Sequence, residues 1–239
     1  DKMKAMILAA GLGTRLRPVT EHIPKALVMV NGMTLLEHAV THLKQYGIDQ
    51  VIINVHHFAD QVIEFVIKKK SFGIQISFSD EREALLETGG GLKKAAWFFN
   101  DGQPFLVRNV DVISDLDLKS LLNYHLASGS MATLVVRSRE TSRYFLFDKD
   151  NRLRGWTNLK TGEKKWVAGP DPQSKLLAFS GIQILDPAVF PLITETGSFS
   201  VTDLYLRLAV TQKITGYMDE HSQWKDIGKS PDDLKTTNG

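Results

Sequence analysis

Cysteine is absent from the 239 residues, which excludes disulfide bridges, zinc–thiolate sites, iron–sulfur clusters and a cysteine nucleophile. An excess of charge of one sign is also lacking, because the formal net charge is only +2. A nucleic-acid or membrane surface needs a concentrated basic face, so neither partner is expected. No apolar run approaches the roughly 18 residues of a membrane span, and the start of the chain does not resemble a signal peptide. We therefore expect a soluble, cytoplasmic protein.

Strand-like and helix-like segments alternate through the first half of the chain. Hydrophobic residues make up 43% of the sequence, which is enough to bury the core of one large α/β domain or two small ones. Short apolar runs predict strands over 4–10, 50–55, 74–80, 104–112 and 131–137. Helical spacing predicts helices over 34–47, 58–70, 92–99 and 118–127. This order, with short connections, predicts a Rossmann-like, doubly wound and mostly parallel sheet.

The second half is richer in strands and turns. Residues 144–156 predict a hairpin with its turn at Asp150–Asn151, and 159–175 predict a polar surface excursion. A strand is expected over 177–185, followed by a helix over 200–210 with Ser200 as N-cap. Short strands are expected over 214–218 and 224–228. This half forms a small β-rich extension that shapes a second pocket.

The stretch AAGLGTRLRPVTEHIPKAL (9–27) directly follows the first strand, where ligands bind in open α/β sheets. Glycines let backbone N–H groups approach phosphate oxygens, while Arg15 and Lys25 supply positive charge. A dinucleotide fingerprint needs a third glycine where Leu16 stands, and a P-loop needs the sequence G-K-[ST]. Both are absent, so the stretch is interpreted as a basic loop around a polyphosphate. A surface turn with solvated arginines is the alternative.

Two further segments carry candidate binding groups. LETGGGLKKA (86–95) suits a turn before a helix, because three consecutive glycines weaken a helix interior. A plain helix start capped by Thr88 is the alternative. Asp111 follows an apolar strand, where a carboxylate can bind Mg²⁺ or simply end the strand. Asp115 and Asp117 are interpreted as residues of a helix start. The adjacent His56 and His57 are poorly placed to chelate one ion, so a structural role is favoured for them.

The first loop resembles the signature of the sugar-1-phosphate nucleotidylyltransferases, which reads G-x-G-[ST]-R-L-x-P followed by P-K. Short N-acetylmuramate-1-phosphate uridylyltransferase-like members are the most similar. The resemblance covers residues 3 to about 234. It implies that the loop grips a nucleoside triphosphate and that the lysine reaches the reacting phosphates. These roles are assigned to Ala10, Gly11, Gly13, Thr14, Arg15 and Lys25.

The same resemblance assigns roles to later residues. Base recognition is assigned to Glu87, Gly89 and Gly90, with Asn109 placed among the nucleotide-binding residues. Asp111 and Asp226, the latter in WKDIGKSPDDL (224–234), are the implied Mg²⁺ ligands.

This chain departs from the family pattern at several positions. Val110 stands where the family has glycine, and Lys229 and Ser230 stand where Thr-Pro is expected, with Pro231 one step later. FSGI (179–182) resembles the strand beside the sugar, which implies Ser180 and Gly181 as sugar-site residues. The family's Glu-Lys-Pro element is not visible, so Glu140 and Arg143 are further candidates for sugar contacts, with a solvated loop as the alternative.

The resulting expectation is a single nucleotidyltransferase domain over 1–239, with a nucleotide-binding half (3–137) and a sugar-phosphate-binding half (138–234). It has the nucleotide-diphospho-sugar transferase fold. The expected reaction is Mg²⁺-dependent transfer of a nucleotidyl group, from UTP by preference, to a sugar 1-phosphate. The alternatives are a guanylyltransferase acting on mannose- or heptose-1-phosphate, a non-catalytic nucleotide-sugar sensor, and, disfavoured by Leu16, an NAD-dependent enzyme. The sequence leaves the oligomeric state open.

Overall fold

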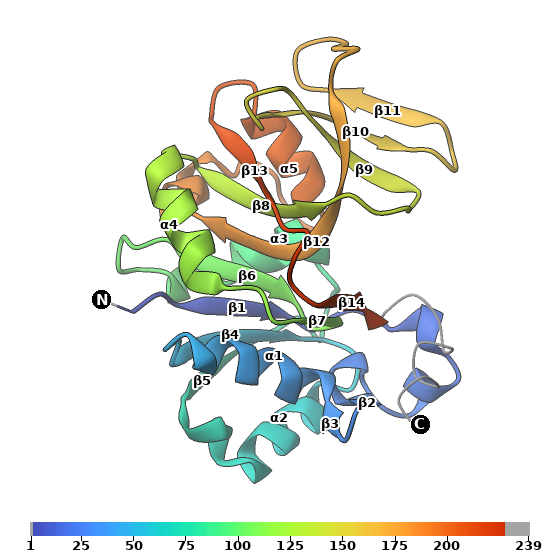
Figure 1. The fold of residues 1–239 in the computed structure, drawn as a ribbon. Helices are drawn as coiled ribbons and strands as arrows, with labels where there is room; N and C mark the ends of the chain where they lie inside the picture. The colour runs from blue at the N-terminus through green and yellow to red at the C-terminus, as the bar shows by residue number, and fades with distance from the viewer. Residues whose placement is uncertain (1, 228–239) are drawn as a thin grey trace.

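The computed structural model describes residues 2–227, which form an α/β fold around one ten-stranded sheet (Figure 1). The strand order is β11-β10-β9-β12-β6-β1-β4-β5, and β8 pairs with both β12 and β13. The strands of this sheet are β1 Ala5–Leu8, β4 Gln50–Val55, β5 Gln75–Asp80, β6 Phe105–Asn109, β8 Ala132–Arg137, β9 Arg143–Phe147, β10 Leu153–Asn158, β11 Glu163–Trp166, β12 Lys175–Leu185 and β13 Ile214–Met218.

The run β6-β1-β4-β5 is parallel throughout, as the alternating pattern of the first half predicts. Strands β1 and β4 in its middle are mostly apolar on both faces, because both faces are covered, whereas the edge strand β5 (QISFSD) alternates and is partly exposed. Ala5 and Ile7 of β1 belong to one hydrophobic core, while Met6 between them belongs to the other. Strand β12 joins antiparallel to β6, so the sheet becomes mixed in the second half.

In the described part of the chain, five α-helices cover the sheet: α1 Leu35–Gln45, α2 Ala59–Lys68, α3 Glu87–Lys94, α4 Leu118–Ser128 and α5 Val201–Leu208. Residues of α1, α2 and α4 belong to the first core, and residues of α3 and α5 to the second (Figure 1). Thr34 and Glu37 form a capping box at the start of α1. Ser200 caps α5 and Asp117 caps α4, as predicted.

Two short ladders lie outside the main sheet. Strand β7 (Val112–Ser114) pairs antiparallel with β14 (Trp224–Asp226). Strands β2 (Met29–Val30) and β3 (Met33–Thr34) form a hairpin that was not expected. Its turn, Asn31-Gly32, has positive φ at both residues, which is the backbone this dipeptide favours. The short 3₁₀ turns are Thr14–Leu16, Val19–Glu21, Lys25–Leu27, Lys70–Gly73, Ala96–Phe98 and Pro187–Leu192.

Three expectations about secondary structure are wrong. Helix α3 begins at Glu87, so the three glycines form its first turns instead of a turn before it. The helix predicted over 92–99 ends at Lys94 and is followed by a 3₁₀ turn. The polar segment 159–175 contains β11, which continues the β9–β10 hairpin by pairing with β10. Its lysines and glutamate did not suggest a strand, but an edge strand tolerates charge well.

No helix among residues 2–227 is both long enough and apolar enough to cross a bilayer.

Candidate active site

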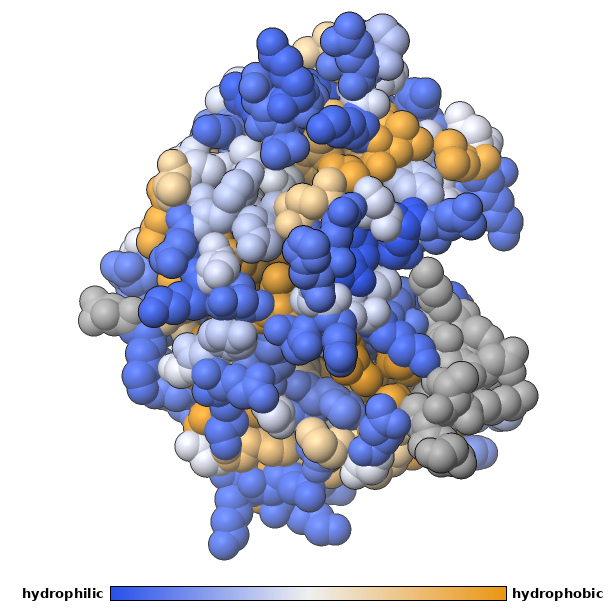
Figure 2. All heavy atoms as spheres, in the orientation of Figure 1, coloured by the Kyte–Doolittle hydropathy of each residue, from blue (hydrophilic) through white to orange (hydrophobic). Residues whose placement is uncertain are grey.

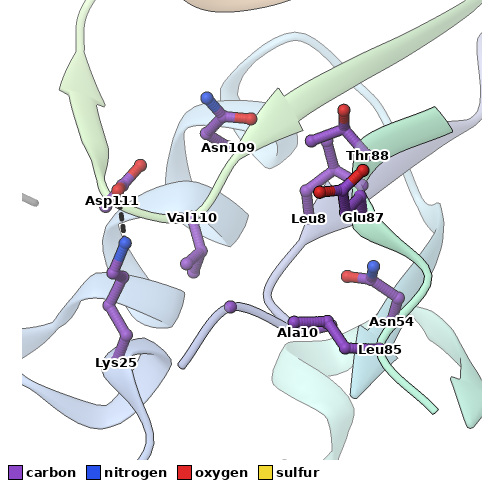
Figure 3. Close-up of a pocket in the computed structure, with 11 residues that line it drawn as sticks. Leu8, Ala10, Lys25, Asn54, Leu85, Glu87, Thr88, Asn109, Val110 and Asp111 are labelled. Atoms are coloured by element: carbon purple, nitrogen blue, oxygen red, sulfur yellow. Dashed lines mark hydrogen bonds and ion pairs between the residues drawn. The ribbon is translucent and has the colours of Figure 1, made fainter. Parts of the chain in front are cut away.

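A cavity of about 220 Å³ lies where β1, β4 and β6 end, which is the binding edge of an open α/β sheet (Figure 3). The first loop, the start of α3 and the turn after β6 converge on it. Its lining residues are Leu8, Ala10, Gly11, Lys25, Asn54, Leu85, Glu87, Thr88, Asn109, Val110 and Asp111. The structure therefore brings together Ala10, Gly11, Lys25, Glu87, Asn109 and Asp111 of the predicted site.

Lys25 and Asp111 form an ion pair at one wall of this cavity (Figure 3). The Lys25 Nζ donates to Asp111 Oδ2 at 2.8 Å, and both side chains are largely buried, with exposed fractions of 15% and 12%. A partly desolvated pair of this kind places a mobile cation and a carboxylate within reach of one ligand. Two residues to which separate roles were assigned, the lysine and the metal-binding candidate, thus lie in direct contact.

Asp226 lies beside Asp111 because β14 pairs with β7. In this ladder Asp226 is opposite Val112, and the Ile227 N–H donates to the Asp111 carbonyl at 2.9 Å. The two aspartates, 115 positions apart in the sequence, therefore sit at adjacent places on two paired segments. Lys229, Ser230 and Pro231 lie outside the described residues, so the family departures there have no structural account.

Val110 fits its turn although the related signature has glycine there. Its φ is not positive, so the backbone at this position does not require glycine. Its side chain is buried in the first core, and its N–H donates to the Leu8 carbonyl at 3.0 Å. Valine therefore anchors the turn that carries Asp111.

The two glycines of the first loop have different structural settings. Gly13 has φ +66°, and a Cβ there would lie 2.8 Å from Thr20 Cγ2, so glycine is required by the fold itself. Gly11 has open space where a Cβ would stand, and it lines the cavity. Thr14 and Arg15 follow in an exposed 3₁₀ turn, with Leu16 buried beneath them.

Gly89 and Gly90 are buried against the segment that leads into α5. A Cβ on Gly89 would lie 2.4 Å from the Phe199 ring, and one on Gly90 would lie 2.5 Å from the Gly197 carbonyl oxygen. Close packing of α3 thus accounts for both glycines. Thr88 does not cap α3, because its hydroxyl accepts from the Val201 N–H at 2.9 Å. Glu87, with φ +58°, and Thr88 line the cavity, whereas Gly89 and Gly90 do not.

A buried hydrogen-bond chain joins the first loop to the start of α3. Asn54 Oδ1 accepts from the Ala9 N–H at 2.6 Å, and its amide donates to Glu81 at 2.8 Å. Glu81, which is 1% exposed, also accepts from the Leu86 N–H at 3.0 Å. A fully satisfied buried network of this kind fixes the relative position of the segments that it joins. The sequence analysis missed this network. The polar Asn54 within a mostly apolar strand is the sequence signal that could have predicted it.

A second cavity, of about 280 Å³, adjoins the first and shares Leu8, Thr88 and Asn109 with it. Its other lining residues come from the second half of the chain: Arg143, Tyr144, Phe145, Trp156, Phe179, Gln183, Ser200, Val201 and Thr202. Of these, only Arg143 was among the candidate sugar contacts. The others come from β9, β10, β12 and the start of α5, so no local sequence motif predicts them.

Arg15 and Asp226 both line a third, open cavity of about 570 Å³. Arg139, Arg143 and Lys160 also line it, which makes its wall strongly basic. Hydrophilic side chains border the indentation on the β14 side of the molecule (Figure 2). The basic residues of the predicted site are thus divided, with Lys25 at the first cavity and Arg15 at the third.

Ser180 and Gly181 form an irregularity in β12, between its pairing at Phe179 and at Gln183. Gly181 has φ +78°, and a Cβ there would lie 2.8 Å from Val112 and 3.0 Å from Asn109 Nδ2. Ser180 is fully buried, and its carbonyl accepts from the Trp224 indole N–H at 2.8 Å. Neither residue is among those that line the second cavity. Both lie behind its wall, where they support Asn109 and β14.

The adjacent residues His56 and His57 have structural roles, and the other sugar-contact candidate, Glu140, does not line the cavities. His56 bonds the Glu81 carbonyl oxygen at 2.6 Å, and His57 bonds that of Thr20 at 3.1 Å, as a structural role requires. Glu140 is exposed and is not among the residues lining the second or third cavity.

Residues 4–238 match the nucleotidyl transferase family. The chain is 45% identical over 229 residues to N-acetylmuramate alpha-1-phosphate uridylyltransferase of Caulobacter vibrioides, covering 94% of this chain and 91% of that protein. It is 31% identical to UTP–glucose-1-phosphate uridylyltransferase of Synechocystis sp., covering 96% of this chain, and 32% identical to mannose-1-phosphate guanyltransferase of Candida albicans, covering 98%. The chain spans only 61% and 64% of the length of those two longer relatives.

Among solved structures, the chain resembles HddC of Yersinia pseudotuberculosis complexed with GMP-PN, at a TM-score of 0.77 and 25% identity, covering 99% of this chain and 98% of that one. A UDP-glucose pyrophosphorylase complexed with UDP-glucose has the same fold, at a TM-score of 0.77 and 17% identity, covering 100% of this chain and 98% of that one. The fold, the motif-bearing loop and the matched span agree, and the chain belongs to the nucleotidyl transferase family.

Proposed function

We propose that the protein transfers a nucleotidyl group from a nucleoside triphosphate to a sugar 1-phosphate, releasing pyrophosphate and forming a nucleotide-sugar. The single observation that carries this proposal is the largely buried Lys25–Asp111 ion pair at the wall of the first cavity, with Asp226 on the strand paired next to Asp111 and lining the third cavity. A non-catalytic sensor would need the pocket alone, without two aspartates brought together from distant segments.

The cavities match a two-substrate reaction. In this proposal the nucleotide occupies the first cavity, where Gly11 and Ala10 let the backbone approach phosphates and Glu87 reads the base. The sugar occupies the second cavity against Trp156 and Tyr144. Because Leu8, Thr88 and Asn109 line both cavities, the reacting phosphates of the two substrates can meet there.

Mg²⁺ is the proposed cofactor, and the donor set fits it. Within residues 2–227, no group of three or more histidine, aspartate or glutamate side chains is arranged to hold a metal ion. Two carboxylates, Asp111 and Asp226, suit an ion that binds one or two protein carboxylates together with substrate phosphates. When bound there, Mg²⁺ supplies neutralising charge to the crowded phosphates.

In the proposed reaction, an oxygen of the sugar 1-phosphate attacks the α-phosphorus of the triphosphate. A new phosphorus–oxygen bond forms while the bond from the α-phosphorus to the bridging oxygen breaks, and pyrophosphate leaves with that electron pair. The attacking oxygen is already anionic at neutral pH, so no side chain needs to remove a proton. Lys25 counters charge at the reacting phosphates, and Arg15 stabilises the departing pyrophosphate.

UTP is the proposed nucleotide, and an N-acetylmuramate-type sugar 1-phosphate is the proposed acceptor. The support is the 45% identity to the Caulobacter vibrioides uridylyltransferase, which this chain matches over 91% of its length. A guanylyltransferase acting on mannose- or heptose-1-phosphate is the second candidate. Similarity to mannose-1-phosphate guanyltransferases and to a structure complexed with GMP-PN supports it.

A pyrophosphate-release assay tests these assignments. The protein is incubated with Mg²⁺, each of the four nucleoside triphosphates in turn, and a panel of hexose, N-acetylhexosamine, muramate-type and heptose 1-phosphates. We expect release with UTP and a muramate-type acceptor. Release with GTP and mannose or heptose 1-phosphate selects the second candidate. Binding of nucleotide-sugar without release from any pair refutes catalysis and supports a sensor.

A further inference from the structure

Arg108 is a buried cation whose side chain contacts the turn that carries Asp111. It lies in β6, is 1% exposed, and is among the largest fully buried side chains. Its hydrogen-bond partners are neutral groups: the carbonyl oxygens of Asn109 and Val112, and Nδ1 of His42. Burial lowers the pKa of Arg108 to about 10, and the charge of Asp111 acts in the opposite direction. Burying a guanidinium whose hydrogen-bond partners are all neutral costs several kcal/mol, so packing alone is a poor explanation for it.

His42 completes the arrangement from α1. Because Arg108 can only donate, Nδ1 of His42 accepts its hydrogen bond at 2.9 Å. Nε2 therefore carries the proton and donates to the Leu116 carbonyl at 2.8 Å. Burial, and then the charge of Arg108, lower the pKa of His42 to about 4, so the ring is neutral under ordinary conditions. Nearby Asp115 acts in the opposite direction and raises this pKa, with a smaller effect.

The carbonyls that Arg108 holds are those immediately before and after the dipeptide Val110–Asp111. The Asn109 carbonyl is on one side at 3.4 Å, and the Val112 carbonyl is on the other. The turn has no glycine, and the Asp111 carbonyl is itself bound by the Ile227 N–H. The backbone of the turn is thus held by two sets of hydrogen bonds, one from the Arg108 side chain and one from the Ile227 N–H that follows β14.

We propose that Arg108 is a positioning residue, which fixes the backbone on both sides of Val110–Asp111 and so holds the Asp111 carboxylate against Lys25, with His42 holding the guanidinium in place. The inference rests on the proposed function, because Asp111 matters for catalysis only if the carboxylate serves a phosphate-bound metal. Removing a group that orients a metal-ligating residue typically weakens the affinity of the site for the metal by about 10- to 100-fold.

The test compares Arg108→Met and Arg108→Lys with the parent protein. Arg154→Met is the matched control, since Arg154 holds the remote Asp148 on the β9–β10 hairpin. One readout is the affinity for Mn²⁺ in the presence of UTP, measured by electron paramagnetic resonance. A second is the crystal structure of each variant. A third is the Mg²⁺ concentration for half-maximal pyrophosphate release, set against the KM for UTP.

We expect Arg108→Met to weaken Mn²⁺ binding about tenfold and to move Asp111 out of hydrogen-bonding distance of Lys25. The KM for UTP should stay within about twofold, because the change acts through the metal-binding carboxylate and not through the triphosphate contacts. Arg108→Lys should be intermediate, since one ammonium replaces a fork of donors. Arg154→Met should change none of the three readouts.

Two histidine variants keep the test informative if Arg108→Met does not fold. His42→Gln retains an acceptor and a donor and should resemble the parent, whereas His42→Leu should shift Mn²⁺ affinity in the same direction as Arg108→Lys. The proposal is overturned if these variants lower the melting temperature while Mn²⁺ affinity and the Asp111–Lys25 contact stay unchanged. If the parent binds no Mn²⁺ and releases no pyrophosphate, the proposed function fails. The crystallographic contact then still decides the positioning role by itself.

Discussion

Lys25 and Asp111 form a 2.8 Å ion pair although 86 positions separate them in the chain. One residue begins the 3₁₀ turn Lys25–Leu27 of the first loop, and the other follows the end of β6. Since the pair is largely buried, neither partner can be removed without leaving a poorly solvated charge behind. The first loop is thereby tied to the centre of the sheet at the place where we propose that phosphates react.

Lys25→Met should reduce turnover by about 10²- to 10³-fold, which is typical for loss of one preorganised charge contact in a transition state. Steady-state kinetics with UTP and the preferred sugar 1-phosphate measures this. Lys93→Met is the matched control, because Lys93 bonds the Glu195 carbonyl away from these cavities. Equal turnover in the Lys25 variant and the parent would remove this lysine from the reaction.

Gly11→Ala and Gly89→Ala should separate binding from packing. Gly11 has free space for a Cβ, so its variant should keep the free energy of unfolding but raise the KM for the nucleotide. Gly89 would place its Cβ within 2.4 Å of Phe199, so its variant should lose about 1–3 kcal/mol of stability through overpacking. Urea unfolding and KM measurements distinguish the two. A stable Gly89→Ala protein would mean that Phe199 moves aside freely.

Gly181→Ala should destabilise the protein by more than Gly102→Ala does. Both glycines have positive φ, at +78° and +71°, so both variants suffer the backbone penalty of about 1–2 kcal/mol. Only Gly181 would also press a Cβ against Val112 and Asn109, whereas Gly102 has open space. The difference between the two free energies of unfolding isolates the steric part. Identical losses would show that the β12 irregularity adapts without cost.

Stability should fall as the pH is lowered from 6.5 toward about 4. The pKa of His42 is lowered to about 4 in the folded protein, mainly by burial, so the unfolded chain binds more protons in this range. The shift corresponds to about 3 kcal/mol at most. Burial lowers the pKa of His125 as well, which adds in the same direction. Below 4.5, the Arg207-stabilised carboxylate of Glu195, whose pKa is about 2, contributes a separate loss.

Urea unfolding at a series of pH values between 4.5 and 7 measures this dependence. His42→Gln should flatten the slope, because the amide does not titrate. A slope unchanged by the substitution would mean that other groups control the acid sensitivity.

Trp156→Ala should raise the KM for the sugar 1-phosphate about tenfold or more, because stacking and apolar contact at the second cavity are lost. The KM for the nucleotide should change little. Trp97→Ala provides the control, since Trp97 is 59% exposed and is not among the residues lining either cavity. An equal effect on both substrates would place Trp156 in a general structural role.

The parallel core of the fold was readable from sequence because both faces of its strands are buried. Runs such as QVIINV then become mostly apolar, with Asn54 as the buried polar exception, and β4 has the limits that were predicted. Helix α3 was misplaced because glycine propensity argues against a helix, whereas packing against Phe199 and Gly197 requires glycine. Local propensity cannot reveal such tertiary contacts.

The first cavity was largely predictable, since most of its groups stand in the first loop, at strand ends and at the start of α3. The second was not, because Tyr144, Trp156 and Thr202 lie on separate elements with no fixed spacing. The Arg108–His42 pair was equally hidden, as each residue occupies an ordinary strand or helix position. A meeting of side chains 66 positions apart becomes visible only when the chain is folded.

Strand β12 pairs with β9 at its start, with β8 from its middle to its end, and with β6 at its end. One continuous backbone is thus shared between the parallel core and the β-rich extension. Unfolding of β12 breaks its ladders with β6, β8 and β9 at the same time. Neither the parallel core nor the β-rich extension therefore keeps all its strand pairings without β12. Heat should therefore melt the protein in one calorimetric peak. The fragments 3–137 and 138–234, produced separately, should regain native structure only when mixed.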